Sequence, residues 1–109
     1  MSYDENLAQR IRELLAGRSG VTEKAMFGGI AFMVNGNMAC GPNKDVLIVR
    51  VGKDAYEETL EHEGAEPMTF TGRPMRGFVE VSLDFLDSDD ELADWVGRGF
   101  DFASSLPAK

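Results

Sequence analysis

The stretch IAFMVNGNMACG, residues 30–41, decides the fold of this chain because it predicts two antiparallel strands joined by a tight turn. From Ile30 to Val34, every second residue is bulky and apolar, which is the two-residue period of a strand. Asn-Gly at positions 35–36 is the strongest short-range signal for a hairpin turn. The return strand is expected over residues 38–41.

Further strands are predicted on both sides of this hairpin. The segment Val46–Val51 is apolar on both faces until Arg50, which indicates a strand inside a sheet rather than at its edge. Gly28 and Gly29 are interpreted as a sheet bulge, because glycine adopts backbone angles that other residues avoid. The remaining predicted strands cover residues 24–27, 68–71 and 78–82.

Three helices are predicted around these strands, over residues 4–16, 54–63 and 88–106. Ser2 with Glu5, and Ser88 with Glu91, have the spacing of a capping box. The element order α-β-β-β-β-α-β-β-α predicts an α+β fold of two layers, with helices packed on a mostly antiparallel sheet. A chain of 109 residues is expected to form a single domain over positions 1–109.

The composition excludes several classes of function. Lys and Arg number 11 against 19 Asp and Glu, which gives a formal net charge of −8. Because phosphate contacts require a clustered basic surface, we expect no direct nucleic-acid partner. No apolar run approaches the roughly 20 residues that span a bilayer, so no membrane partner is expected. The polar, acidic N-terminal segment and a single cysteine predict a cytoplasmic protein.

Three segments carry a resemblance to a known family. They are KAMFGG at 24–29, VNGNM at 34–38, and the block from Pro67 to Gly77 that contains GRPMRG. Together with the last helix and its Trp95, they resemble the TfoX N-terminal domain. The resemblance extends over residues 3–106, nearly the whole chain.

The resemblance implies a fold similar to that of small secretion chaperones and a role in regulation. Proteins of the TfoX type regulate natural competence in some bacteria. Longer members of the family also carry a C-terminal helical domain, which this chain, ending at Lys109, is expected to lack. The resemblance brings no catalytic residues and no cofactor with it, so neither is expected here.

Cys40 and His62 are the residues that would serve an enzyme. A reactive thiol needs a cation, a metal or a helix start to lower its pKa, and the sequence places none beside Cys40. We therefore interpret Cys40 as a buried structural residue and His62 as an exposed one. Since zinc sites usually combine several His or Cys ligands, no metal site is predicted. A nucleophilic Cys–His pair remains an alternative of low weight.

Four basic residues form the candidate binding site of this acidic chain: Lys24, Arg50, Arg73 and Arg76. The segment from Gly72 to Gly77 is predicted to be a loop that Pro74 stiffens. Converging arginines bind carboxylates or phosphates bidentately, although these side chains can equally pair with the chain's own acids.

The leading hypothesis is a non-enzymatic regulatory or protein-interaction domain, in transcriptional or competence-like regulation. Its partner would be another protein, bound through a sheet face or edge, and a homodimer stays open. The alternative is a binding module for a small anionic ligand that uses Arg50, Arg73 and Arg76.

Overall fold

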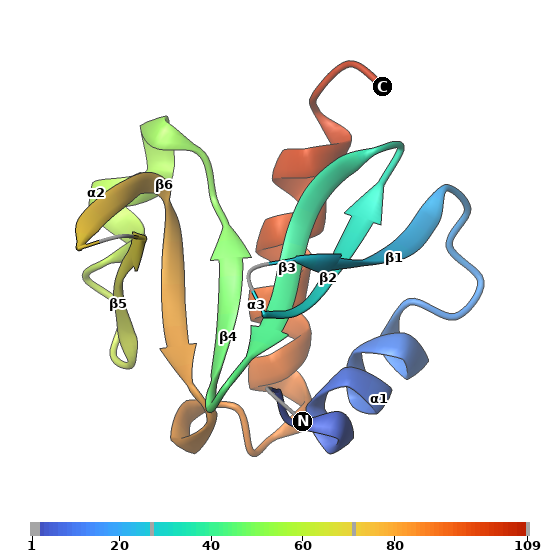
Figure 1. Ribbon diagram of the computed structural model, residues 1–109, viewed down its shortest axis with the longest axis horizontal. Coiled ribbons are helices and arrows are strands. Elements are labelled where there is room, and N and C mark those ends of the chain that lie inside the picture. The colour runs from blue at the N-terminus through green and yellow to red at the C-terminus, as the bar shows by residue number, and fades with distance from the viewer. Residues whose placement is uncertain (1–2, 27, 71, 109) are drawn as a thin grey trace.

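The computed structural model describes residues 3–26, 28–70 and 72–108 (Figure 1). Three helices and six strands follow one another in the order predicted from the sequence. Their bounds are α1 Glu5–Leu14, β1 Val21–Met26, β2 Gly29–Val34, β3 Asn37–Asn43, β4 Val46–Arg50, α2 Lys53–Thr59, β5 Ala65–Phe70, β6 Arg73–Ser82 and α3 Asp89–Ser104, with a short 3₁₀ turn at Leu83–Phe85.

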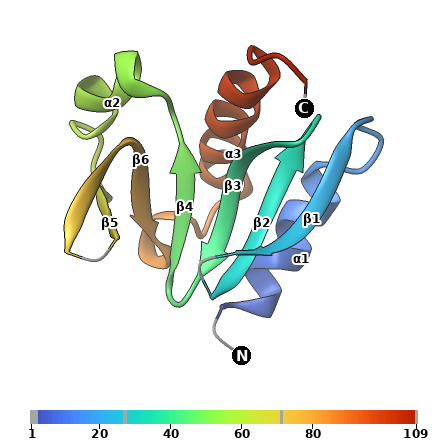
Figure 2. The same cartoon turned by 45° about the horizontal axis from the view of Figure 1, so that its top comes forward.

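The six strands form one open antiparallel sheet in the order β1-β2-β3-β4-β6-β5. Figure 1 looks onto the face of the sheet that carries no helix, and α3 runs behind β3 and β4. Figure 2 shows α1 and α3 on the same side, and α2 beside the first half of β6. The fold is therefore α+β with two layers, as the sequence predicted.

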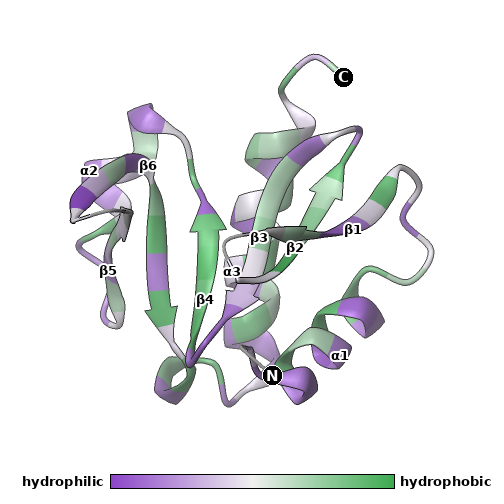
Figure 3. Ribbon diagram, viewed as in Figure 1, coloured by the Kyte–Doolittle hydropathy of each residue, from purple (hydrophilic) through white to green (hydrophobic). Residues whose placement is uncertain are grey.

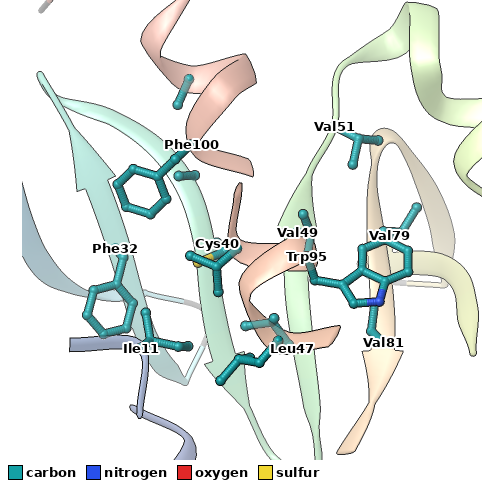
Figure 4. Close-up of a cluster of buried hydrophobic side chains, with 14 of the residues drawn as sticks. Ile11, Phe32, Cys40, Leu47, Val49, Val51, Val79, Val81, Trp95 and Phe100 are labelled. Carbon is teal, nitrogen blue, oxygen red and sulfur yellow. The ribbon is translucent and has the colours of Figure 1, made fainter. Parts of the chain in front are cut away.

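The main core lies between the sheet and the helices (Figure 4). Side chains of alternating residues, such as Phe32 on β2 and Leu47 on β4, project toward Trp95 and Phe100 of α3. Phe32, Leu47 and Phe100 are at most 1% exposed. Because burying each such side chain contributes about 1.5–3 kcal/mol, this layer carries much of the stability.

A second, smaller apolar cluster lies on the face without helices. Ile48 of β4 and Met38 of β3 are buried there, and Phe78 packs against them. This cluster explains why the sequence of β4 is apolar at consecutive positions, which Figure 3 shows as hydrophobic colour along most of the strand. The prediction of an inner strand at this place is confirmed.

The hairpin predicted at Asn35 and Gly36 is confirmed. Both residues have positive φ angles, 51° and 85°, as a two-residue type I′ turn requires. The glycine pair before the hairpin was interpreted wrongly. Met26 pairs with Gly29, so the chain reverses between them, and Gly28 has a φ of 82°. Register irregularities occur instead where β2 pairs with β3, beside Phe32, and where β5 pairs with β6, between Pro67 and Thr69.

The predicted loop over 72–77 was also wrong, because Arg73 already begins the ten-residue strand β6. Proline in a strand removes one hydrogen-bond donor and is tolerated where one side of the strand is unpaired. Pro74 meets this condition, since β5 pairs with it, whereas β4 pairs only with the stretch Phe78–Ser82. Arg73 and Arg76 therefore lie on a strand extension and not in a loop.

The helix ends follow capping rules. Ser88 accepts a hydrogen bond from the Glu91 N–H, so its predicted role as the N-cap of the last helix is confirmed, and its hydroxyl donates to the Glu91 carboxylate. At α1 the N-cap is Asp4, whose carboxylate accepts from the Leu7 N–H. Ser2, predicted for this role, lies outside the described residues. Helices α2 and α3 end before the predicted limits, at Thr59 and Ser104.

Candidate functional site

A pocket opens where β4 ends and the chain turns into α2. Its volume is about 650 Å³, and its walls come from the end of β4, the start of α2, β6 and the last turns of α3. Five of its lining residues decide its chemistry: Arg50, Lys53, Arg76, Phe78 and Phe102. The pocket therefore combines cationic groups with aromatic rings.

Backbone hydrogen bonds fix the two sides of this pocket to each other. The N–H groups of Val51 and Gly52 both donate to the Gly77 carbonyl oxygen, at 2.8 and 3.1 Å. Gly52 has a φ of 86°, and a side chain at this position would collide with the ring of Phe102. Glycine is required here on both counts.

Arg50 is the central residue of the pocket. It is half-buried, and its guanidinium lies 5.6 Å from the ring centroid of Phe78 and 5.4 Å from that of Phe102. It donates one long hydrogen bond, 3.5 Å, to the Met38 carbonyl oxygen. No described acid forms an ion pair with it. Cation–π contacts thus orient this guanidinium and leave most of its donors free.

Arg76 reaches the same pocket from β6 but is more exposed. Its guanidinium lies 3.6 Å from a Glu57 carboxylate oxygen and 5.6 Å from the ring centroid of Tyr56. The Arg76 and Glu57 side chains are 63% and 74% exposed, so water screens this ion pair and its contribution to stability is small. Arg76 is accordingly free to exchange Glu57 for another anion.

The structure brings together two of the four basic residues proposed from the sequence. Arg50 and Arg76 line the pocket, whereas Lys24 lies exposed on β1 and Arg73 exposed at the start of β6, and neither lines it. Lys53 was missed. The sequence around Gly52 does not indicate that Lys53 lies near Arg50 and Arg76. That proximity arises only when β4, β6 and α3 pack together in the tertiary structure.

Two further pocket residues, Phe78 and Phe102, were assigned to other roles by the sequence. Phe78 opens the predicted strand 78–82, and Phe102 lies within the predicted helix 88–106. Both are half-buried and in contact with Arg50.

Cys40 and His62 do not form a catalytic pair. Cys40 is fully buried in the main core, and burial raises the pKa of its thiol to about 12, which suppresses the nucleophilic thiolate. His62 instead packs edge-on against Trp95, with ring centroids 5.8 Å apart, in a shallow depression lined also by Asp90 and Asp94. Across the described ranges, no three His, Cys, Asp or Glu side chains gather as a metal site would require.

Comparison with known proteins adds the family. Within the described residues, no helix is both long and apolar enough to cross a membrane. No curated protein matches the chain. The model of the TfoX N-terminal domain matches residues 13–103, and this range includes α2, all six strands, the pocket residues except Ser105, and most of α3. The chain therefore belongs to the TfoX N-terminal domain family.

Proposed function

We propose that this chain is a non-enzymatic regulatory domain that acts by binding, and that the Arg50 pocket is where it holds an anionic group. One observation carries the proposal. Arg50 is half-buried and stacked between two phenyl rings, yet it has no ion-pair partner among the described acids, in a chain with 19 acidic residues.

The physical argument starts from the cost of burying a charge. A guanidinium withdrawn from water is stabilised by cation–π contacts with rings and by hydrogen bonds to an anion. The two phenyl rings supply the cation–π contacts, but the hydrogen bonds require an anion. The other described arginines of α1 and α3 make the contrast. Arg10, Arg12 and Arg98 each form an ion pair with an Asp or Glu. Arg18 also has a ring contact and no ion pair with a described acid, but it is exposed to water, whereas Arg50 is half-buried. A half-buried arginine without an acidic partner keeps its fork of donors available to a bound anion.

The test is a titration of the labelled protein with two simple anions, inorganic phosphate and acetate, followed by NMR. Chemical-shift changes are expected at the Arg50 side-chain N–H and at the backbone amides of residues 50–53 and 76–78. In Arg50→Gln these changes should fall at least tenfold, because the charge-assisted hydrogen bonds are lost.

The matched control is Arg18→Gln. Arg18 also stacks on a phenyl ring, with its guanidinium 5.4 Å from the Phe100 centroid, but it lies outside the pocket. This variant should bind both anions as the wild type does. Equal binding by Arg50→Gln and the wild type would contradict the proposal, as would a wild type that binds neither anion.

A second candidate is protein binding at the free edge of β1, and one observation favours it. Residues 22–25 of this edge strand are all exposed, whereas the opposite edge strand, β5, contains Pro67, which removes a backbone donor. Two-fold pairing of β1 with itself, centred on Glu23 or Lys24, would set like charges opposite each other. The edge therefore suits another protein's strand better than a second copy.

A further inference from the structure

We infer that the ligand of the Arg50 pocket is a monocarboxylate carried on a flat, apolar body. This inference rests on the proposed function and names the class of anion that the pocket selects. Three features of the pocket carry it: the mixture of its walls, the acids near its mouth, and its size.

The first feature is the division of the pocket into a cationic and an apolar part. Arg50, Lys53 and Arg76 supply positive charge, while Phe78 and Phe102 supply ring surface. A small, fully hydrated anion would use only the cations and would leave the rings in water. A ligand that joins an anionic head to an apolar body satisfies both parts, as ligand sites generally do.

The second feature is negative charge close to the cations. Asp54 lines the pocket, and Glu57 pairs with Arg76 at its mouth. Attraction to the three cations and repulsion from the two acids both scale with the ligand's charge, so these acids offset much of the advantage that a phosphate dianion would otherwise have over a carboxylate. The planar carboxylate also matches the fork of the Arg50 guanidinium, with two parallel hydrogen bonds.

The third feature is the room available. A volume of about 650 Å³ falls within the roughly 300–1,000 Å³ typical of small-molecule pockets and far exceeds what acetate or phosphate fills. The two rings are already held in place by Arg50. Phe78 and Phe102 also line the pocket, so a flat apolar body can lie against the ring surface that faces it, and this preorganisation favours tight binding.

Such a carboxylate has two sources, a free aromatic acid or the C-terminal residue of a peptide. The experiment separates them by calorimetric titration with six probes: 2-naphthoate, 2-naphthalenemethanol, acetate, inorganic phosphate, and two forms of a short peptide ending in Phe, one with a free and one with an amidated C-terminus. We expect 2-naphthoate to bind at least tenfold more tightly than acetate, phosphate or the alcohol.

Three variants assign this preference to the pocket. Arg50→Gln should bring 2-naphthoate down to the level of the alcohol. Phe102→Leu should lower the affinity for 2-naphthoate toward that for acetate, and the thermal midpoint of this variant checks its folding. Arg50→Lys, which keeps the charge but loses the planar fork of donors, should retain only part of the affinity. Asp54→Asn should strengthen phosphate more than 2-naphthoate, because the dianion gains more from the lost repulsion.

The outcomes separate this inference from the function on which it rests. Phosphate or acetate binding as tightly as 2-naphthoate, with dependence on Arg50, would overturn the ligand class and leave anion binding standing. Equal binding of the acid and its alcohol would also overturn it. Loss of all Arg50 dependence would overturn both. A free-terminus peptide that binds more tightly than both its amide and 2-naphthoate assigns the carboxylate to a protein terminus. 2-Naphthoate that binds more tightly than either peptide assigns it to a free acid, and an amidated peptide that binds more tightly than the free one overturns the inference.

Discussion

Glu80 lies on the helix-free face of the sheet, where it is opposite Ile48 on one neighbouring strand and Glu66 on the other. Partial burial raises the pKa of this carboxyl, and the nearby negative charge of Glu66 raises it further. Lys44 acts in the other direction and does not cancel these effects. The folded state therefore favours the protonated, neutral form of the Glu80 side chain.

The sign of the pH dependence follows directly. A carboxyl whose pKa is higher in the folded chain than in the unfolded chain contributes stability when it is protonated. For Glu80 that contribution is present below the unfolded pKa, near 4.3 for a free glutamate, and is lost as the pH rises through the folded value. At neutral pH the charge therefore costs stability.

We predict that Glu80→Gln raises the free energy of unfolding at pH 7 by a few tenths to about 1 kcal/mol, the range for like charges opposite each other on neighbouring strands. The gain should shrink toward pH 4, where the wild-type carboxyl is protonated. Chemical denaturation at both pH values measures it. Glu66→Gln, on an exposed side chain, should gain less, and a Glu80→Gln variant that loses stability at pH 7 would contradict the assignment.

At the scale of elements, β1 is held to the fold on one side only. It pairs with β2, and α1 braces it through the Arg12–Glu23 ion pair, in which two hydrogen bonds of 2.8 and 2.9 Å join the side chains. Hydrogen bonding from this guanidinium lowers the pKa of Glu23. The outer edge thus keeps a fixed shape while its backbone groups face outward.

We predict that proline substitutions at neighbouring β1 positions, Lys24→Pro and Ala25→Pro, act in opposite ways. In an antiparallel edge strand, N–H groups point alternately toward the paired strand and away from it. One proline should lower the thermal midpoint by removing a bond to β2. The other should keep the midpoint and abolish capture of a protein partner by affinity chromatography.

The control for this pair of variants is Lys24→Ala, which keeps both backbone donors and should preserve fold and capture. If the proline variant that folds normally still captures the same partner, strand addition at β1 is excluded. Sedimentation of the wild type completes the test. We expect no dimer formed through β1, because pairing of this edge with a second copy would set like charges opposite each other.

At the scale of the whole molecule, a net charge of −8 determines which polymers the surface can approach. Among the described basic residues, the three that line the pocket lie there together with Asp54. Three others, Arg10, Arg12 and Arg98, already form ion pairs with acids. Within the part of the chain that the structure describes, no basic stripe is left to neutralise successive phosphates.

We therefore predict no appreciable binding of the chain to duplex DNA at physiological salt. Fluorescence anisotropy of a labelled duplex, titrated with the protein at low and at physiological salt, checks this, with a basic DNA-binding domain as the positive control. Tight binding that weakens steeply with salt would show that the charge argument is wrong.

The sequence predicted the layers of this molecule better than the details of its surface. The alternation from Ile30 to Val34 and the Asn-Gly turn are local signals, and both were confirmed. The strand that begins at Arg73 was missed because glycine and proline read as a loop, whereas pairing with β5 overrides that local preference.

For the candidate site, the sequence supplied the charges but not their neighbours. Arg50 and Arg76 were singled out as basic residues of an acidic chain, and both line the pocket. The rings of Phe78 and Phe102 were not assigned to it, because they come from β6 and α3 and meet Arg50 only when the sheet and the last helix pack. No periodicity in the chain records such a meeting.

The position of β4 between two apolar clusters determines how rarely this strand opens. Leu47 and Val49 are buried on its helix side and Ile48 on its other side, so opening this strand exposes both clusters at once. Segments of this kind open only in rare, nearly global unfolding events, while sheet edges open often. Arg50 ends this strand, so we expect the proposed binding site to persist for nearly the whole lifetime of the folded chain, with an occupancy set by the supply of ligand rather than by local opening of the pocket.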